Sequence, residues 1–374
     1  MRPGIRLNSD RNESIVVFRI GSLGDTISSL PALREVRRRH PSERIVLLTN
    51  SPVDGGLRAA SSVQVLTGMQ LVDDFVEYPH GSRNFLSLAR VMLALRTRRA
   101  RICYYLVGGR TQEQIRRDRF FFQVSGIRKY VGMTEDAMHH RAPEPGQALW
   151  ESEAKRTLRA VNGEGRSIST TDFSLDLSEE ERNTASRALR EAGIRSPYLV
   201  VCVGSKAPAK DWGNDRWRNA LEILSTRIPH VGLVGIGAAS ERGRTDDVLD
   251  SWTGAKANLC GLLLPRESGA VIEGAALYMG HDSGPMHLAN AVGTPIVAVF
   301  AARSQPGIWF PHGQEAGVFY RDVPCAGCGL DVCTVAGHIC MSDIRATDVA
   351  QRACEVLDHN RARLGASQKP KSLA

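Results

Sequence analysis

Short runs of apolar residues alternate with segments of helical periodicity along most of this chain. In the first half, such runs predict buried strands at residues 15–18, 45–48, 75–78 and 102–106. After the first of these, residues 31–39 place apolar side chains at helical spacing and end before Pro41. Strands that alternate with helices predict βαβ units built around a parallel sheet.

The second half repeats this alternation. Further apolar runs predict strands at residues 198–203, 231–234, 277–280 and 296–300. Helical patterns at residues 215–227 and 286–292 separate them. Residues 135–176 are polar, rich in Gly and Pro and weakly periodic, so we interpret them as an insertion or a partly mobile connection. Ser178 then starts a helix with a capping-box pattern, and Gly193 ends it.

Two α/β halves of similar size predict two Rossmann-like domains facing a cleft, residues 1–177 and residues 178–374, with a basic tail after residue 365. The length of 374 residues fits two domains at roughly 150 residues each. No apolar run approaches the roughly 18 residues of a transmembrane helix, and residues 1–13 lack the apolar core of a signal peptide. We therefore expect a cytoplasmic protein.

The charge balance narrows the choice of partners. Lys and Arg number 48 and Asp and Glu 40, so the formal net charge is +8. We interpret this modest excess either as an ordinary basic surface or as attraction to a phosphorylated small molecule or an anionic membrane surface. The basic residues show no interleaved aromatic stripe, so nucleic acid is not an expected partner.

The first candidate site follows the strand predicted at residues 15–18. Gly21 and Gly24 let the backbone turn sharply at the carboxyl end of that strand, the edge at which open α/β sheets bind ligands. Their Gly-x-x-Gly spacing is not the dinucleotide-binding fingerprint, which argues against a dehydrogenase. Asp25 follows, and we interpret it either as a general base or as a cap of the next helix.

The second candidate site follows the strand predicted at residues 198–203. Ser205, Lys206 and Lys210 lie in a loop that leads into a helix. A hydroxyl and two ammonium groups in such a loop suit a phosphate, although loop lysines are often only solvated.

The third candidate site is the run His281-Asp282-Ser283-Gly284-Pro285-Met286-His287-Leu288, which follows a predicted strand and opens a helix. Asp282 or Ser283 is suited to cap that helix, and Pro285 suits its first turn. Backbone N–H groups of this turn and the helix dipole together suit a diphosphate. His287 lies one turn further on, on a face that reaches the same ligand; a pure capping role is the alternative.

These three loops together predict a transferase, with a base in one domain and a diphosphate site in the other. The chain contains no Asp-x-Asp pair, so nothing in it indicates a divalent metal that holds the diphosphate. Near the end of the chain, cysteines follow the spacing C-x2-C-x4-C-x6-C at Cys325, Cys328, Cys333 and Cys340. We interpret them either as a structural zinc site or as reduced structural cysteines.

At these residues the chain resembles the bacterial heptosyltransferase family, the ninth family of glycosyltransferases, from about residue 14 to residue 357. The opening segment, residues 19–33 with Ser22-Leu23-Gly24-Asp25, is similar to the start of the family. The run Asp282-Ser283-Gly284-Pro285-Met286-His287-Leu288-Ala289, with Gly293-Thr294-Pro295, is similar to its most specific signature. The cysteine-rich segment that ends at Cys340-Met341 is similar to its C-terminal region.

The resemblance implies a GT-B fold and an inverting, metal-independent transfer of a heptose-like sugar. It implies a nucleotide-sugar donor, ADP-heptose first among them, and a lipopolysaccharide or other envelope glycan as acceptor, with no further cofactor. It places Asp25 as the catalytic base and Lys210 on the leaving diphosphate. It assigns donor binding to Ser205, Lys206, Glu241, Asp282, Ser283, Gly284, Pro285, Met286 and His287.

Acceptor binding is assigned to Gly24 and, from charge alone, to Arg110, Arg116 and Arg117, whose alternative is a solvated surface. A lipid-linked acceptor implies peripheral contact with the cytoplasmic face of the inner membrane. Two departures from the family pattern, Asp211-Trp212-Gly213 after Lys210 and Ala301-Ala302-Arg303 after Phe300, leave the nucleotide and the sugar open. Another nucleotide-sugar reaction such as epimerisation, or binding without catalysis, are the alternatives.

Overall fold

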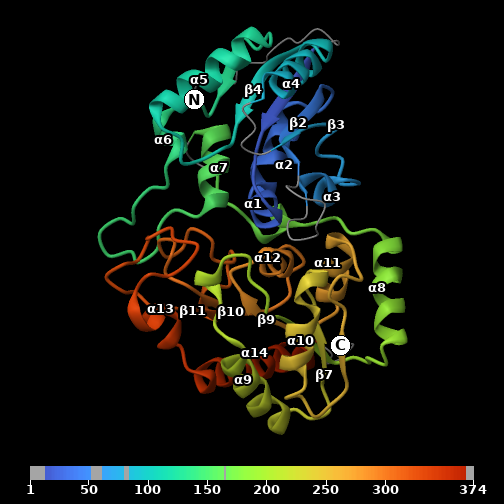
Figure 1. Ribbon diagram of the computed structural model, residues 1–374. Coiled ribbons are helices and arrows are strands. Elements are labelled where there is room, and N and C mark those ends of the chain that lie inside the picture. The colour runs from blue at the N-terminus through green and yellow to red at the C-terminus, as the bar shows by residue number, and fades with distance from the viewer. Residues whose placement is uncertain (1–12, 52–60, 80–83, 164–165, 368–374) are drawn as a thin grey trace, which may run out of the picture. The chain divides into compact units, whose positions relative to one another are not determined.

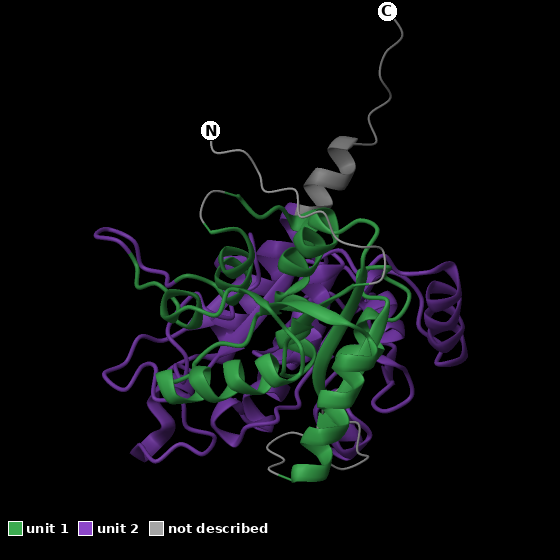
Figure 2. Ribbon diagram, turned by 90° about the horizontal axis from the view of Figure 1, so that it is seen from above, with its two compact units in different colours: residues 1–143, 151–172 green, residues 144–150, 173–374 purple. Residues whose placement is uncertain are grey.

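The computed structural model describes residues 13–51, 61–79, 84–163 and 166–367. The chain divides into two compact units (Figure 2). Unit 1 comprises Met1–Pro143 and Glu151–Asp172, and unit 2 comprises Glu144–Trp150 and Phe173–Ala374. No helix in the described part of the chain is both long enough and apolar enough to cross a membrane.

Unit 1 is built on a parallel sheet with the strand order β3-β2-β1-β4-β5 (Figure 1). The strands are β1 (Ser14–Phe18), β2 (Arg44–Ser51), β3 (Asp74–Pro79), β4 (Ala100–Tyr105) and β5 (Lys129–Val131). β1 pairs in parallel with both β2 and β4, and all its residues are buried. Helices cover both faces of a parallel sheet, which explains why its central strands are continuous apolar runs.

Two helices cover one face of this sheet, α4 (Phe85–Thr97) and α5 (Gln112–Val124). Their buried residues, among them Leu95 and Phe122, form one core cluster with Phe18 and Tyr105 of the sheet. The remaining helices of unit 1 are α1 (Leu23–Ser28), α2 (Leu30–Arg39), α3 (Ser62–Leu66), α6 (Glu135–Met138) and α7 (Glu153–Asn162). Of these, α7 packs against α1 and α2.

The expectation of an insertion or mobile connection at residues 135–176 is wrong. This segment contains α6, α7 and a 3-10 turn (η1, Thr170–Phe173). The buried face of α7 includes the charged residues Glu153 and Arg156 beside Leu158 and Val161. Ala154, Leu158 and Val161 are buried at helical spacing, so the periodicity of α7 was present in the sequence and was overlooked.

Unit 2 contains a second parallel sheet, with the order β11-β10-β9-β6-β7-β8. Its strands are β6 (Tyr198–Cys202), β7 (Gly232–Gly235), β8 (Lys256–Asn258), β9 (Leu277–His281), β10 (Ile296–Phe300) and β11 (Val318–Tyr320). All strands predicted from apolar runs are present in the two units. The strands that were missed, β5, β8 and β11, are three-residue edge strands without fully buried residues.

The core of unit 2 lies between its sheet and three helices, α9 (Asn214–Arg227), α10 (Arg242–Leu249) and α14 (Ala346–Ser367). The indole rings of Trp212, Trp217 and Trp252 are buried there. The other helices are α8 (Glu179–Glu191), α11 (Pro265–Glu273), α12 (Gly284–Ala291) and α13 (Ile339–Ser342). Helix α14 continues beyond the predicted start of the tail, and the rest of that tail, residues 368–374, lies outside the described residues.

Candidate active site

The strand order reverses at one point in each sheet. In unit 2, the chain runs from β6 outward to β7 and β8, and then returns to β9 on the opposite side of β6. Loops that leave neighbouring strands in opposite directions open a crevice at the carboxyl edge, where open α/β sheets bind ligands. The loops after β6 and β9 carry Lys210 and Asp282, two of the predicted donor-site residues.

Lys210 ends a 3-10 turn after β6 (η2, Pro208–Lys210) and reaches the loop after β9. Its Nζ lies 2.6 Å from Asp282 Oδ2 and donates to Asp282 O at 3.2 Å. His287 Nε2 lies 4.0 Å from Oδ1 of the same carboxylate, and Asp282 is only 6% exposed. The structure therefore brings together three residues that the sequence placed in two separate loops.

Helix α12 starts beside this ion pair. Ser283 occupies the N-cap position and Pro285 lies in the first turn, but no side chain makes a capping hydrogen bond. The expectation that Asp282 or Ser283 caps α12 through its side chain is therefore wrong, because the carboxylate of Asp282 is paired with Lys210 instead. The first turn of α12 thus presents N–H groups without a side-chain cap, next to an ammonium group, which suits an anion.

Glu241 lies at the same sheet edge, one strand further along. It ends a 3-10 turn after β7 (η3, Ala239–Glu241), and its Oε2 accepts a hydrogen bond from the N–H of Ala238 at 2.8 Å. Its carboxylate lies so close to Gly204 and Gly237 that a Cβ atom at either glycine would overlap it. In the β6 loop, Ser205 Oγ donates to Ala207 O at 3.0 Å, and Lys206 is exposed.

His281 is the residue of this edge to which sequence analysis assigned no role. Its ring is fully buried, and Nε2 accepts hydrogen bonds from the N–H of Trp212 at 3.0 Å and from Nε1–H of Trp217 at 3.1 Å. Nε2 must therefore be unprotonated, which places the proton on Nδ1, 3.4 Å from Gly204 O. Burial lowers the pKa of His281 to about 4, so the ring is neutral at physiological pH.

Asp211, the residue that follows Lys210, forms an ion pair with Arg244. Both oxygens of Asp211 accept hydrogen bonds from the guanidinium of Arg244, at 2.5 and 2.6 Å. Burial alone would raise the pKa of Asp211, but the hydrogen bonds from Arg244 outweigh it and lower that pKa. Asp211 was noted in the sequence only as a departure from the family pattern, and the structure gives it a positioning role beside Lys210.

In unit 1, Asp25 lies at the corresponding edge, in the loop and helix that follow β1. Its Oδ2 accepts hydrogen bonds from the N–H and the hydroxyl of Ser22, at 2.8 and 3.0 Å, while Oδ1 lies 3.3 Å from Nη2 of Arg19. The side chain of Asp25 remains 29% exposed. The two interpretations of Asp25 are thus compatible, because the carboxylate completes the start of α1 and stays accessible to a substrate.

A buried network places Arg19 beside Asp25. Nη1 of Arg19 lies 2.7 Å from Glu153 Oε1 and donates to Leu106 O at 2.9 Å. Arg156 contacts the same carboxylate, with Nε 2.7 Å from Oε2 and Nη2 2.7 Å from Oε1. Burial alone would raise the pKa of Glu153, but the two guanidinium groups outweigh it and hold the pKa at about 2. Sequence analysis missed Glu153 and Arg156, because no motif marks them.

Two of the three predicted acceptor arginines, Arg110 and Arg117, meet at the carboxylate of Asp118. Arg110 Nε lies 3.9 Å from Asp118 Oδ2, and Arg117 Nη2 lies 2.9 Å from Asp118 Oδ1. The hydroxyl of Tyr105 also donates to Asp118, at 2.6 Å. Arg116 is exposed on α5.

The structure does not show a gathered metal site at the cysteine cluster in its described residues. All four residues have free thiols; Cys340 is buried, Cys328 is exposed, and Cys325 and Cys333 are intermediate. Within the described residues, no three His, Cys, Asp or Glu side chains gather as metal ligands. A structural zinc site and reduced structural cysteines thus both remain predictions for these four residues.

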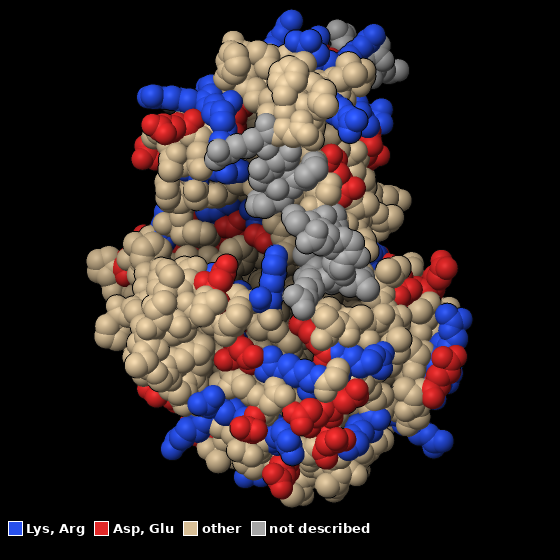
Figure 3. All heavy atoms as spheres, in the orientation of Figure 1, with Lys and Arg blue, Asp and Glu red and all other residues tan. Residues whose placement is uncertain are grey.

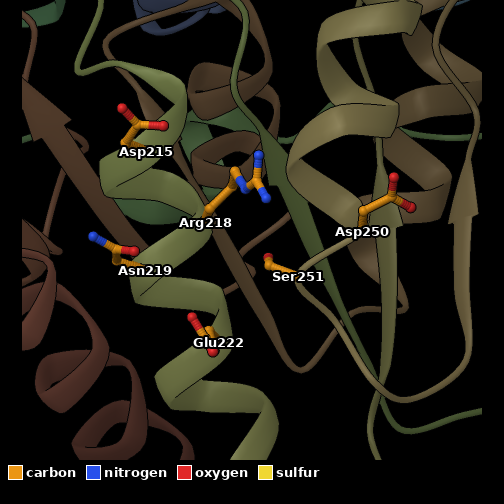
Figure 4. A pocket seen from close by; sticks show the side chains of 6 residues that line it. All are labelled: Asp215, Arg218, Asn219, Glu222, Asp250 and Ser251. Carbon is orange, nitrogen blue, oxygen red and sulfur yellow. The ribbon is translucent and has the colours of Figure 1, made fainter.

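A polar pocket on unit 2 lies apart from the candidate residues (Figure 4). It is lined by Asp215, Arg218, Asn219, Glu222, Asp250 and Ser251. None of the predicted donor or acceptor residues lines it, so it adds nothing to the candidate site.

Comparison with known proteins shows which family the chain is similar to. The profile described as Glycosyltransferase family 9 (heptosyltransferase) matches residues 153–337. Over 301 residues the chain is 24% identical to lipopolysaccharide heptosyltransferase 3 of Escherichia coli K12, covering 78% of this chain and 83% of that protein. The chain is therefore similar to the glycosyltransferases of family 9.

Solved structures of the family share its fold. A family 9 glycosyltransferase from Veillonella parvula superposes with a TM-score of 0.70 at 17% identity, over 94% of this chain and 99% of that one. The ADP-heptose lipopolysaccharide heptosyltransferase II of E. coli gives a TM-score of 0.65 at 19% identity, over 93% and 99%. The two parallel α/β units are thus those of a GT-B glycosyltransferase, and the chain is an enzyme of the transferase class.

Proposed function

We propose that this glycosyltransferase moves a heptose-like sugar from ADP-heptose to a lipopolysaccharide or related envelope acceptor, with inversion at the anomeric carbon and without an active-site metal. The observation that carries the proposal is the Lys210–Asp282 pair at the start of α12, at the strand reversal of unit 2. The donor and the acceptor come from the descriptions of the two E. coli relatives.

The donor part of the proposal rests on charge. As the bond between sugar and diphosphate breaks, negative charge grows on the departing oxygens. The ammonium of Lys210 and the N-terminus of α12 lie at one edge and both stabilise such charge, which is the task that a metal performs in other enzymes. Glu241, a pure hydrogen-bond acceptor at the same edge, suits the hydroxyl groups of a ribose.

The acceptor part of the proposal rests on Asp25. A carboxylate that is partly exposed and oriented by Ser22 and Arg19 can accept the proton of an attacking hydroxyl group. The oxygen of that hydroxyl forms the new glycosidic bond as the bond to the diphosphate breaks, and the proton passes to Asp25. Attack from the face opposite the diphosphate inverts the configuration.

A thermal-shift series tests the donor. ADP, UDP, GDP, CDP and dTDP are each added with magnesium, without it, and with a chelator. A nucleotide at about 100 times its Kd adds roughly 2.7 kcal/mol to the free energy of unfolding. We expect ADP alone to stabilise the protein without magnesium, and Lys210→Met to weaken the effect. Lys256→Met, in an exposed ion pair with Asp250, is the matched control. Stabilisation by another nucleotide instead of ADP would contradict the assignment of ADP-heptose as the donor.

Turnover of Asp25→Asn tests the base. We expect kcat to fall by about 10²- to 10⁴-fold while the affinity for ADP is retained. Glu113→Gln, another acid in the first turn of a unit 1 helix, is the control. A loss of only a few-fold in Asp25→Asn would show that the base lies elsewhere. Release of free sugar from the donor without any acceptor would favour a different nucleotide-sugar reaction.

A further inference from the structure

Two helices of unit 1 expose large apolar side chains. Leu93 on α4 is 61% exposed and Phe120 on α5 is 68% exposed, and the first turn of α4 adds Phe85 and Leu86, at 80% and 65%. Single exposed apolar residues are ordinary on protein surfaces, but a group of them marks an interaction site. We call the outward surface of these two helices the α4–α5 surface.

The two helices are joined at their carboxyl ends. Nε and Nη2 of Arg96 both donate to Val124 O, at 3.0 and 2.6 Å. Leu93 precedes Arg96 by one turn, and Phe120 precedes Val124 by one turn. Leu93 and Phe120 thus lie within about one turn of this junction, whereas Phe85 and Leu86 lie at the other end of α4.

Arginines accompany these apolar residues. Arg90 lies one turn before Leu93, and Arg116 lies one turn before Phe120; both are exposed, and neither forms an ion pair with a described residue. Helix α4 contains no acidic residue. On α5, Asp118 is already engaged by Tyr105 and Arg117, and the exposed Glu113 lies in the first turn. Figure 3 shows Lys and Arg atoms around uncharged surface in the region that Figure 1 labels α4 and α5.

We propose that the α4–α5 surface docks on an anionic phospholipid membrane. Apolar side chains that alternate with arginines match a bilayer interface, where anionic head groups lie next to acyl chains. The centre of a protein–protein interface is instead depleted of charge, with polar groups at the rim. The inference rests on the proposed function in one respect only, because a lipid-linked acceptor gives this surface a reason to contact the membrane.

Co-sedimentation with vesicles tests this docking, in the absence of nucleotide and acceptor. We expect the full chain to bind vesicles of phosphatidylcholine mixed with phosphatidylglycerol, far more than vesicles of phosphatidylcholine alone, and binding to fall as salt is added. Arg90→Gln and Arg116→Gln should each weaken binding about fivefold. Leu93→Ser combined with Phe120→Ser should weaken it further. Arg187→Gln with Arg190→Gln on α8, and Leu262→Ser, are matched exposed controls in unit 2.

Three results would overturn the inference. They are equal binding to both kinds of vesicle, an unchanged Leu93→Ser/Phe120→Ser variant, and an equal loss in the unit 2 controls. Self-association that this double variant abolishes, without vesicle binding, would assign the surface to a second copy of the chain. ADP-induced thermal stabilisation, measured on the same variants, reports the fold and the donor site separately. Vesicle binding without any nucleotide binding would contradict the proposed function but would still support membrane docking by the α4–α5 surface.

Discussion

His281 holds three segments of the donor site with one buried ring. Its neighbours are Trp212 in the β6 loop, Trp217 in α9 and the carbonyl of Gly204, and the residue that follows it is Asp282. The ring must be neutral to accept two N–H groups at Nε2. Lys210 lies two residues before Trp212. Its position therefore depends on the neutral state of His281, to which it is linked through Trp212.

Replacing His281 by Phe leaves the N–H of Trp212 and the indole N–H of Trp217 without their acceptor. An unsatisfied buried donor costs about 1–3 kcal/mol, so for these two donors we expect a loss of about 2–6 kcal/mol in the free energy of unfolding, together with weaker ADP binding. Urea unfolding and ADP titration measure the two effects. The exposed His230→Phe is the control. Stability and ADP affinity equal to those of the unaltered protein would refute this role.

The same residue predicts a pH dependence. The pKa of His281 is about 4 in the folded protein and 6.5 in the reference state, so the unfolded chain takes up the proton first as pH falls. The contribution of the neutral ring is complete above about pH 6.5 and declines towards pH 4, by about 3 kcal/mol in all. The difference in unfolding free energy between the unaltered protein and His281→Phe should therefore shrink between pH 7.5 and pH 5. A constant difference across that range would contradict the assignment.

At the scale of elements, helix α7 is joined to the end of β1 by a buried ion pair between Glu153 and Arg19. Glu153 and Arg156 lie on the buried face of α7, and Glu153 connects the helix to Arg19 at the end of β1. The helix thus helps to orient the residue that contacts Asp25. These buried charges, together with the apolar residues Leu158 and Val161, fix α7 within unit 1.

Substitution of Glu153 by Gln should destabilise unit 1, because Arg19 and Arg156 would remain buried without their shared carboxylate. Removing one partner of a buried ion pair costs about 3–5 kcal/mol. We also expect kcat to fall with little change in ADP affinity, since Asp25 loses the orientation of Arg19. Unfolding and steady-state kinetics of Glu153→Gln, beside the exposed Glu180→Gln, measure this. A fall in ADP affinity equal to the fall in kcat would argue against a role limited to Asp25.

Elements with two buried faces were the easiest to predict. The central strands β1 and β6 are buried throughout, whereas β5 and β8 include polar residues and β11, Val-Phe-Tyr, is only three residues long. The loops of the donor site could be predicted too, because carboxyl ends of parallel strands share an edge. The Lys210–Asp282 contact could not, since it depends on the direction of side chains in two loops far apart in sequence.

At the scale of the whole molecule, the two units carry different parts of the proposed reaction. If the donor binds through the β6 and β9 loops, ADP should slow amide hydrogen exchange mainly at residues 204–211 and 281–287 of unit 2. The strands of unit 1 should exchange at unchanged rates. Hydrogen exchange with and without ADP measures this pattern, and UDP provides the control. Protection confined to unit 1 would move the donor site out of unit 2.

The pairing of Lys210 with Asp282 has a consequence for selectivity among cellular anions. Because the ammonium group lies 2.6 Å from Asp282 Oδ2, the pair offers a small anion little uncompensated positive charge. A small anion such as orthophosphate must compete with the carboxylate of Asp282 without the contacts that a nucleotide adds. Inorganic phosphate should therefore inhibit weakly, which competition kinetics can check. An enzyme that works among abundant free phosphate would in this way keep its donor site open for the nucleotide sugar.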